Sequence, residues 1–424
     1  MEHVPVLVVG AGITGLAFAD QLQDCDYQIV EAAEEPGGYC RTVLQDGFVW
    51  DYSGHFFHFR HPEIEADLVR RMGPEKVRIV ERQSRIHYAG GLIDFPFQKN
   101  IHQLPHDEFM ACLVDLFERP EGEADNFQDM LVAKFGRAVA DKFLIPYNEK
   151  LYATDLRRLD VQAMGRFFPY AEPADIVRNF RRANNESYNA TFTYPEGGAM
   201  QYVHALAQGV EPARLHLNEA VERIDLETRI AHTTRRSLRF DNLISSMPYD
   251  RLLRLCGLAA DPALFTYNKV LVFNLGFDRK GPEGLHWIYY PQRELSFYRV
   301  GFYDNIFETP RMSLYVELGY ARDALLDADV IAAARARVLA DLERVQVVQG
   351  HTLVAEHHVV LDPAYVHITR ASQAAVTEGK AVLATAGVYS LGRYGSWTYC
   401  SIEDNIVEAR TLAALFNRRL SCRE

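Results

Sequence analysis

The sequence predicts an α/β protein in which a Rossmann-like domain is interrupted by a mainly helical domain and by an antiparallel β-sheet domain. Near the N-terminus, an apolar run at 4–9 and a helically spaced segment at 13–22 flank a glycine-rich turn. From about 104 to 180 the spacing is helical and strand signals are sparse. Between 271 and 318, short apolar or alternating runs indicate an antiparallel sheet.

The Rossmann-like domain is expected to open with a βαβ unit. The run at 4–9 suits a buried parallel strand, 13–22 suits a helix, and 27–31 supplies the second strand. Residues 221–244 return to short strands with turns, which indicates that the chain re-enters this domain. A strand over 381–386 and a helix over 402–416 are expected to close it.

Two further domains are expected between these segments. The clearest helices of the first are 127–135 and 138–144, and a helix over 324–344 follows the strands of the second. The predicted strands are 271–275, 285–290, 297–302 and 312–318. The expected division is 1–95, 200–260 and 376–424 for the discontinuous Rossmann-like domain, 96–199 for the helical domain and 261–375 for the antiparallel sheet domain.

Composition excludes several classes of protein. The chain has 424 residues, enough for two or three domains, and its net charge of -12 disfavours nonspecific binding to nucleic acid. The six cysteines form no C-x-x-C pair and have no histidine at zinc spacing, so no metal site is expected. The apolar stretch 4–19 lacks a basic flank and contains three glycines, which argues against a signal sequence. No run reaches the ~18 apolar residues of a membrane span, and we expect a cytoplasmic protein without stable membrane insertion.

The turn after the first strand carries the sequence G-x-G-x-x-G. Gly10 permits a tight turn, Gly12 lets the backbone approach a pyrophosphate, and Gly15 allows the helix to pack closely on the strand. Glu31 stands at the end of the second predicted strand, where an acid can accept hydrogen bonds from an adenosine ribose. The whole arrangement predicts a dinucleotide site, and both NAD and FAD fit it.

The residues that follow favour FAD. EEPGGYCRT contains Gly37, Gly38 and Arg41, and GFVWDYSGH ends in Gly54 and His55. These segments resemble the second signature of the flavin amine oxidase and protoporphyrinogen oxidase superfamily. The resemblance implies a Rossmann-like FAD-binding domain of the GR2 type, with the Gly-Gly turn and the arginine along the cofactor. It also implies that Val221 contacts the adenine.

Four further segments resemble UDP-galactopyranose mutases, more the eukaryotic branch than the bacterial one. They are SGHFFHF at 53–59, DFPFQKNI at 94–101, FLIPYNEKLYA at 143–153 and GRYGSWTY at 392–399. The resemblance implies a nucleotide-sugar substrate and an isomerase that interconverts pyranose and furanose rings in cell-surface polysaccharide biosynthesis. In that family N5 of reduced FAD attacks the anomeric carbon and forms a covalent sugar adduct, with no net redox change.

The same resemblance assigns roles to individual residues. Arginines and tyrosines are expected at the departing diphosphate, because guanidinium forks match phosphate oxygens and phenols donate without adding charge. The residues implied at the substrate are Arg299, Arg166, His55, Tyr289, Tyr399, Asn148 and Gln98. Those implied at the flavin are Gly54, His55, Gly392, Arg393 and Ile402.

Other roles for these residues remain open at this stage. Arg166 can equally be a solvated surface charge, Tyr289 an ordinary strand aromatic and Asn148 a capping residue. Histidines at 55, 58 and 61 are compatible with a metal cluster, but no carboxylate or cysteine supports one.

The chain also departs from the mutase pattern. Phe95 replaces a tyrosine, Tyr152 replaces a tryptophan, Ser53 replaces a glycine, and the GNQDHS segment near the flavin is here shortened to SIEDNI, changes expected to line the sugar and uridine pockets. Two other functions are therefore kept: a flavin oxidase or desaturase acting on an amine or carbocycle, and a noncatalytic flavin-binding protein. NAD(P)H is a candidate reductant, and a homodimer is left open.

Overall fold

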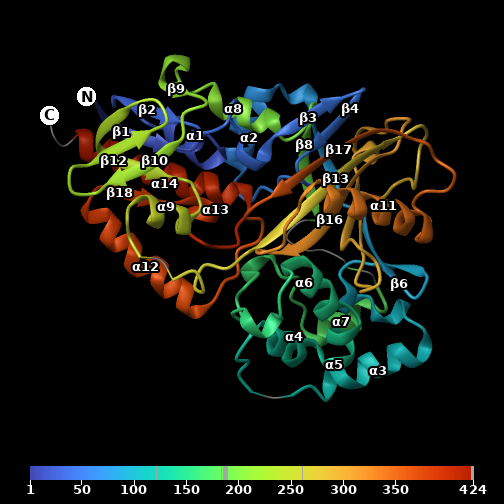
Figure 1. The fold of residues 1–424 in the computed structure, drawn as a ribbon. Helices are drawn as coiled ribbons and strands as arrows, with labels where there is room; N and C mark the ends of the chain where they lie inside the picture. Colours follow the sequence, from blue (N-terminus) through green and yellow to red (C-terminus); the bar gives the residue numbers. More distant parts are fainter. Residues whose placement is uncertain (121, 183, 185–189, 260, 422–424) are drawn as a thin grey trace.

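The computed structural model describes residues 1–120, 122–182, 184, 190–259 and 261–421. Figure 1 shows three parts: a sheet with helices around it that carries both ends of the chain, a second long sheet, and a group of helices packed against one end of that second sheet. The mixed α/β architecture agrees with the fold class that the sequence predicts.

The first sheet is built around β1 (Glu2–Val9). Its order is β10-β11-β12-β1-β2-β9, and β18 pairs with β12. The other strands are β2 (Tyr27–Val30), β9 (Leu215–His216), β10 (Val221–Asp225), β11 (Ile230–Thr233), β12 (Ser237–Ser245) and β18 (Val388–Ser390). Strand β1 pairs in parallel with β2 and with β12, which lies more than 200 residues further along the chain. The expected re-entry of the chain is therefore observed.

Helices cover this sheet. They are α1 (Ile13–Ala19), α2 (Pro62–Met72), α8 (Met200–Ala207), α9 (Tyr249–Leu255), α12 (Arg370–Thr385), α13 (Gly392–Gly395) and α14 (Ile402–Ser421). The prediction of a strand over 381–386 is wrong, because residues 381–385 form the end of α12 and Ala386 is its C-cap. A capping box between Thr369 and Ser372 starts this helix, and its alanines favour continuation to Thr385. The closing strand comes afterwards, as β18.

The second sheet has the order β17-β13-β16-β15-β14-β6-β7. Its strands are β6 (Ser84–Tyr88), β7 (Gly91–Asp94), β13 (Asn268–Phe277), β14 (Trp287–Tyr289), β15 (Arg299–Phe302), β16 (Ser313–Ala321) and β17 (Leu353–Leu361), with α10 (Asp304–Phe307) and α11 (Ala328–Arg344) beside them. The sequence missed β17 and expected only antiparallel pairs, whereas β14 and β6 are parallel. Residues 84–94 were placed with the Rossmann-like segments, but their strands hydrogen bond to β14. We propose a division before residue 84 in place of 95.

The helical part follows β7. Its helices are α3 (His106–Phe117), α4 (Phe127–Phe135), α5 (Arg137–Val139), a π-helix (Ala140–Leu144), α6 (Ile145–Tyr152) and α7 (Pro173–Asn179). Two small ribbons complete the chain: β3 (Thr42–Gln45) with β4 (Phe48–Asp51), and β5 (Val77–Glu81) with β8 (Thr191–Pro195). None of the helices within the described residues is long and apolar enough to cross a membrane.

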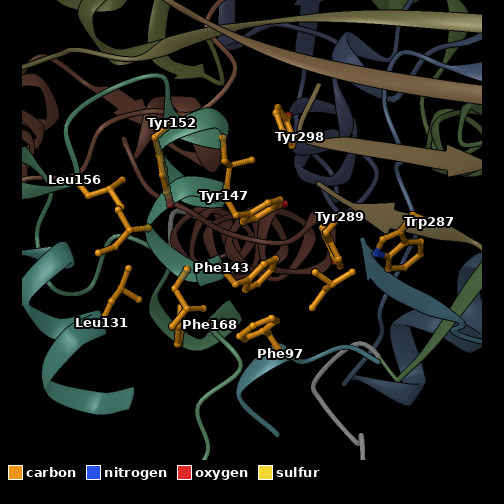
Figure 2. Packing of buried hydrophobic residues seen from close by; sticks show 14 of the residues in the cluster. Phe97, Leu131, Phe143, Tyr147, Tyr152, Leu156, Phe168, Trp287, Tyr289 and Tyr298 are labelled. Carbon is orange, nitrogen blue, oxygen red and sulfur yellow. The ribbon is translucent and has the colours of Figure 1, made fainter. Parts of the chain in front are cut away.

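An aromatic core joins the helical part to the second sheet (Figure 2). Phe97 and Phe143 stack with ring centroids 5.2 Å apart, and Tyr147 meets Tyr289 of β14 edge to face at 5.3 Å. Such pairs bury large apolar areas and add a geometric preference. The packing fixes α6 beside β14, and this is the region where the sequence places the substrate residues.

Thr369→Ala tests the cap of α12. The substitution removes the hydroxyl that accepts the backbone N–H of Ser372, and we expect it to lower the free energy of unfolding by about 1 kcal/mol. Thr377→Ala is the matched control, since Thr377 is exposed within the same helix and bonds only to the carbonyl of Gln373. It should change stability by no more than about 0.5 kcal/mol in the same denaturant titration. Equal effects of both variants would contradict the assigned cap.

Candidate functional site

A cavity of about 590 Å³ lies where the three parts of the fold meet. We divide its lining by chain segment: the first end is the turn after β1 and the end of β2, and the middle is the loop after β4. The second end is the part lined by α6, β14, β15 and the loop before α14. Residues from 9 to 405 therefore converge on one space, as expected for a binding site between domains.

The glycine turn forms one wall of the cavity. Gly10 has φ +102°, and a Cβ at Gly15 would stand 1.9 Å from the carbonyl oxygen of Gly10, so α1 packs directly on the turn. Gly10 and Gly12 both line the cavity, but a Cβ at Gly12 would meet no protein atom within 4 Å, whereas one at Gly10 would stand 2.5 Å from Ser246 Oγ. Glu31 accepts the backbone N–H groups of Ala11 at 2.7 Å and Ala33 at 2.9 Å. The turn thus leaves an open surface of backbone on the cavity side.

Most residues implied for the cofactor line this cavity. Besides Gly10, Gly12 and Glu31, they are Gly37, Gly38, Gly54, His55, Val221, Arg393 and Ile402. Gly15, Arg41 and Gly392 lie outside the lining. Arg41 turns back to its own loop, where it donates to the carbonyls of Pro36 and Glu35. Gly392 precedes Arg393 in the chain, and its backbone N–H donates to the carboxylate of Glu408.

Arg393 is a half-buried cation, and no carboxylate lies within 4.0 Å of its guanidinium among the described residues. One Nη donates to the carbonyl of Cys400 at 3.3 Å, and its buried Nε has no partner among them. The guanidinium lies 4.7 Å from the ring centroid of Tyr399 and 5.2 Å from that of Tyr365. A half-buried charge of this kind is costly unless a ligand compensates it, so the position fits an anionic or electron-rich group.

His55 lies on the loop after β4. Its Nδ1 is buried and lacks a partner among the described residues, and burial lowers the pKa of its imidazole to about 4. It is therefore neutral near pH 7. His58 Nδ1 donates to the carbonyl of Thr191, and His61 pairs with Glu63 instead of joining His55. No three His, Cys, Asp or Glu side chains of the described chain are grouped to hold a metal ion.

Arg299 faces Glu317 across the β15–β16 pair. Its Nε lies 2.6 Å and its Nη2 2.7 Å from the two carboxylate oxygens, a bidentate fork, and Glu317 is only 1% exposed. The hydroxyl of Ser53 donates to the same carboxylate. The sequence predicted Arg299 as a cation for phosphate and missed Glu317. An acid within the otherwise apolar run LYVELGY was the available signal.

Arg166 and Gln98 are not brought to the lining. Arg166 forms an ion pair with Asp404 at 2.7 Å and covers the ring of Phe167. Gln98 donates to the carbonyl of Pro169, and its Oε1 lacks a partner among the described residues. Asn148 does line the cavity. Its Nδ2 donates to the carbonyl of Leu144 at 2.7 Å, and its buried Oδ1 has no hydrogen-bond partner among the described residues.

Tyrosines dominate the second end of the cavity. The tyrosines there are Tyr147, Tyr289, Tyr298, Tyr365 and Tyr399, of which the sequence singled out Tyr289 and Tyr399, and the lining also includes Tyr39 and Tyr394. Tyr365 and Tyr399 stack with centroids 5.9 Å apart. Phe95 also lines the cavity, against Tyr289 at 5.0 Å. Tyr152 was expected in a substrate pocket, but it is fully buried behind Tyr365 and supports that ring.

Comparison with known proteins shows which family the chain resembles. The model of the family described as flavin containing amine oxidoreductase matches residues 13–380. A zeta-carotene-forming phytoene desaturase of Myxococcus xanthus is 48% identical over 70 residues, 16% of this chain and 13% of that protein. Chloroplastic protoporphyrinogen oxidase of Nicotiana tabacum is 24% identical over 178 residues, 37% of this chain and 30% of that protein. The chain thus spans less than a third of these relatives.

The fold itself is similar to a solved structure. The crystal structure of reduced UDP-galactopyranose mutase superposes with a TM-score of 0.87, over 97% of this chain and 93% of that chain, at 23% sequence identity. At this identity the likeness concerns the fold, and it confirms the expected Rossmann-like architecture with its helical and sheet parts.

Gly12→Ala tests the open wall of the cavity. Its Cβ would enter space where no protein atom lies within 4 Å, so we expect the fold to survive and FAD affinity to fall by roughly tenfold or more. Gly91→Ala, at the exposed first residue of β7, should leave FAD binding unchanged. The measurement is the flavin absorbance per protein after titration with FAD, beside the thermal unfolding temperature. Full FAD content in Gly12→Ala would remove this glycine from the cofactor site.

Proposed function

Because the chain belongs to the family of flavin containing amine oxidoreductases, we propose that it binds FAD and, with the flavin reduced, interconverts the pyranose and furanose forms of a nucleotide sugar. UDP-galactose is the default substrate, by the resemblance of the motifs at 53–59, 94–101, 143–153 and 392–399. The similarity of the whole fold to reduced UDP-galactopyranose mutase supports this proposal.

The residues of the cavity fit FAD. The backbone around Gly12 would receive the pyrophosphate, and Glu31, whose two oxygens keep free lone pairs, would receive the ribose. Arg393 would lie at the flavin, where its unpaired Nε can find an acceptor. Reduced FAD, when bound, supplies an electron-rich N5 that can act as the nucleophile on an anomeric carbon.

The single observation that carries the proposal is a set of buried polar atoms that have no hydrogen-bond partner among the described residues. Five of them belong to residues that line this cavity: His55 Nδ1, Asn148 Oδ1, Trp287 Nε1, Tyr298 OH and Arg393 Nε. Each such atom costs about 1–3 kcal/mol if it stays unpaired. A flavin and a substrate rich in hydroxyl and phosphate oxygens would satisfy them, whereas an apolar substrate would leave those at the second end unpaired.

The cavity residues can bind a leaving diphosphate and exclude water from it. Phenol groups such as that of Tyr399 donate hydrogen bonds, and the guanidinium of Arg299 retains N–H groups beyond those given to Glu317. His55 is neutral, so it can accept or donate one hydrogen bond without adding charge. Arg166 would join the diphosphate only after leaving Asp404.

A second function is favoured by one observation. Aromatic rings such as Phe95, Tyr289 and Tyr399 surround the second end of the cavity, as expected for an oxidase or desaturase that holds an apolar substrate against the flavin. The names of the two sequence relatives agree with that chemistry. This alternative predicts bleaching of the oxidised flavin by the substrate, and the mutase predicts turnover without net oxidation.

The first experiment compares the oxidised and the reduced protein. FAD-loaded protein is incubated with UDP-galactofuranose, with and without dithionite, and UDP-galactopyranose is measured by chromatography. We expect conversion only with reduced flavin, and NAD(P)H in place of dithionite tests the candidate reductant. Bleaching of oxidised flavin by an amine or a carbocyclic substrate, with no sugar conversion, would favour the oxidase.

Arg299→Lys tests the predicted diphosphate ligand. Lysine keeps a positive charge beside Glu317, so no carboxylate is stranded in the core, but the guanidinium fork is lost. We expect turnover to fall roughly a hundredfold with FAD still bound. Arg279→Lys is the control, because Arg279 is exposed and bonds to the carbonyls of Gln349 and Gly350. Unchanged turnover in Arg299→Lys would place the diphosphate elsewhere.

A further inference from the structure

Lys150 makes an unusual set of contacts on the side of α6 that faces the second sheet. Its Nζ donates to the backbone carbonyls of Tyr290 at 3.1 Å, Gln292 at 2.8 Å and Phe297. No carboxylate of the described chain lies within 4.0 Å of this ammonium group. All three N–H groups of one lysine are therefore given to one loop, residues 290–298, which joins β14 to β15.

Residues that line the second end of the cavity lie at both ends of this loop. Tyr289 precedes it, while Tyr298 and Arg299 end it, and all three line the cavity. On the other side, α6 presents Tyr147 and Asn148 to the same cavity. Lys150 thus connects the two walls between which a substrate would lie.

We propose that Lys150 is a positioning residue, whose ammonium group holds the 290–298 loop against α6 and sets the separation of Asn148 from Arg299. The inference deepens the proposed function and rests on it. A shift of about 1 Å in such a wall is enough to weaken binding and catalysis strongly. Lys150 itself lies outside the lining, so it acts through the groups that it holds.

The surroundings make this lysine hard to replace. Helix α6 lies so close to β16 that a Cβ at Gly319 would stand 2.1 Å from the carbonyl oxygen of Lys150, which brings the side chain within reach of the loop. Other contacts hold the loop at its outer side: Arg293 pairs with Glu149 at 2.5 Å, and Ser296 N–H donates to Asp341. These contacts do not reach Tyr290 or Phe297, which lie near the two ends of the loop, where the backbone N–H of Tyr290 donates to the carbonyl of Tyr298 at 2.9 Å.

The protonation of Lys150 provides a readout that a simple loss of stability would not give. Burial lowers the pKa of its ammonium group to about 7, opposed by Asp341 and Glu294. Above this pH the amine keeps two N–H groups and can serve only two of the three carbonyls. The charged and titratable groups facing it or its loop are Asp341 and Arg337 on α11, Glu294 and Arg293 in the loop, Glu149 on α6, and His87 on β6, whose ring stacks on Tyr290.

The test uses Lys150→Met and Lys150→Arg in the FAD-loaded protein, with Lys142→Met as the matched control. Lys142 pairs with Glu108 at 2.8 Å in the same helical part, outside the cavity lining. We expect Lys150→Met to raise amide hydrogen exchange in 290–298 and to weaken UDP binding roughly tenfold or more, with FAD affinity unchanged. The Lys150→Arg variant should keep part of the protection of residues 290–298 from exchange and part of the UDP affinity, since a guanidinium still donates to several carbonyls.

The pH dependence of UDP binding completes the test. Between pH 7 and 9 we expect UDP affinity to fall in the wild type and to be flatter in Lys150→Met. Unchanged exchange in 290–298, or equal UDP binding by the wild type and Lys150→Met, would overturn the inference. If the wild type does not bind UDP, the proposed function fails, and the exchange of the loop decides alone whether Lys150 holds it.

Discussion

At Gly319 the backbone of helix α6 lies directly against strand β16, because the glycine leaves room for the carbonyl oxygen of Lys150. This close approach determines how the side chains at the second end of the cavity are arranged. It places Tyr147 against Tyr289, and it lets one lysine reach the β14–β15 loop. Aromatic packing then fills the space between helices and sheet, so the two walls of the cavity keep a fixed separation. The positions of the polar and charged groups in the site therefore depend on this backbone contact.

The charges in the cavity follow from this burial. Arg299 is neutralised by Glu317, and its partner also accepts from Ser53, the residue that stands where the mutase pattern has glycine. Arg393 has no such partner among the described residues. Arg251 also lines the cavity and has no ion-pair partner among the described residues. A phosphate entering the cavity would therefore meet two cations without a carboxylate partner, one balanced ion pair and several neutral donors. Because a balanced pair attracts an anion less than a free cation does, the proposed diphosphate binding would draw on the phenols for part of its binding energy.

The sequence predicted what is encoded locally. The G-x-G-x-x-G turn requires only adjacent residues, and its geometry at Gly10 and Gly12 agrees with the expected open backbone. Pairings between distant segments were not predictable, such as β6 with β14, because nothing near residue 84 specifies its neighbour. Glu317 and Lys150 were missed for the same reason: their roles come from groups on other elements. The alanines of 381–386 were misread as a strand, since a short apolar run has no clear period.

The polar and the aromatic features of the second end of the cavity can be weighed against each other. Aromatic rings suit both a sugar and an apolar substrate, because ring faces pack against carbon in either case. Unpaired buried atoms do not have this freedom. Asn148 Oδ1 and Tyr298 OH need partners that an apolar chain cannot offer, and each would cost about 1–3 kcal/mol in its complex. A substrate with hydroxyl groups at both positions avoids this cost, which is why the balance of these contacts favours a nucleotide sugar over a carotenoid-like substrate.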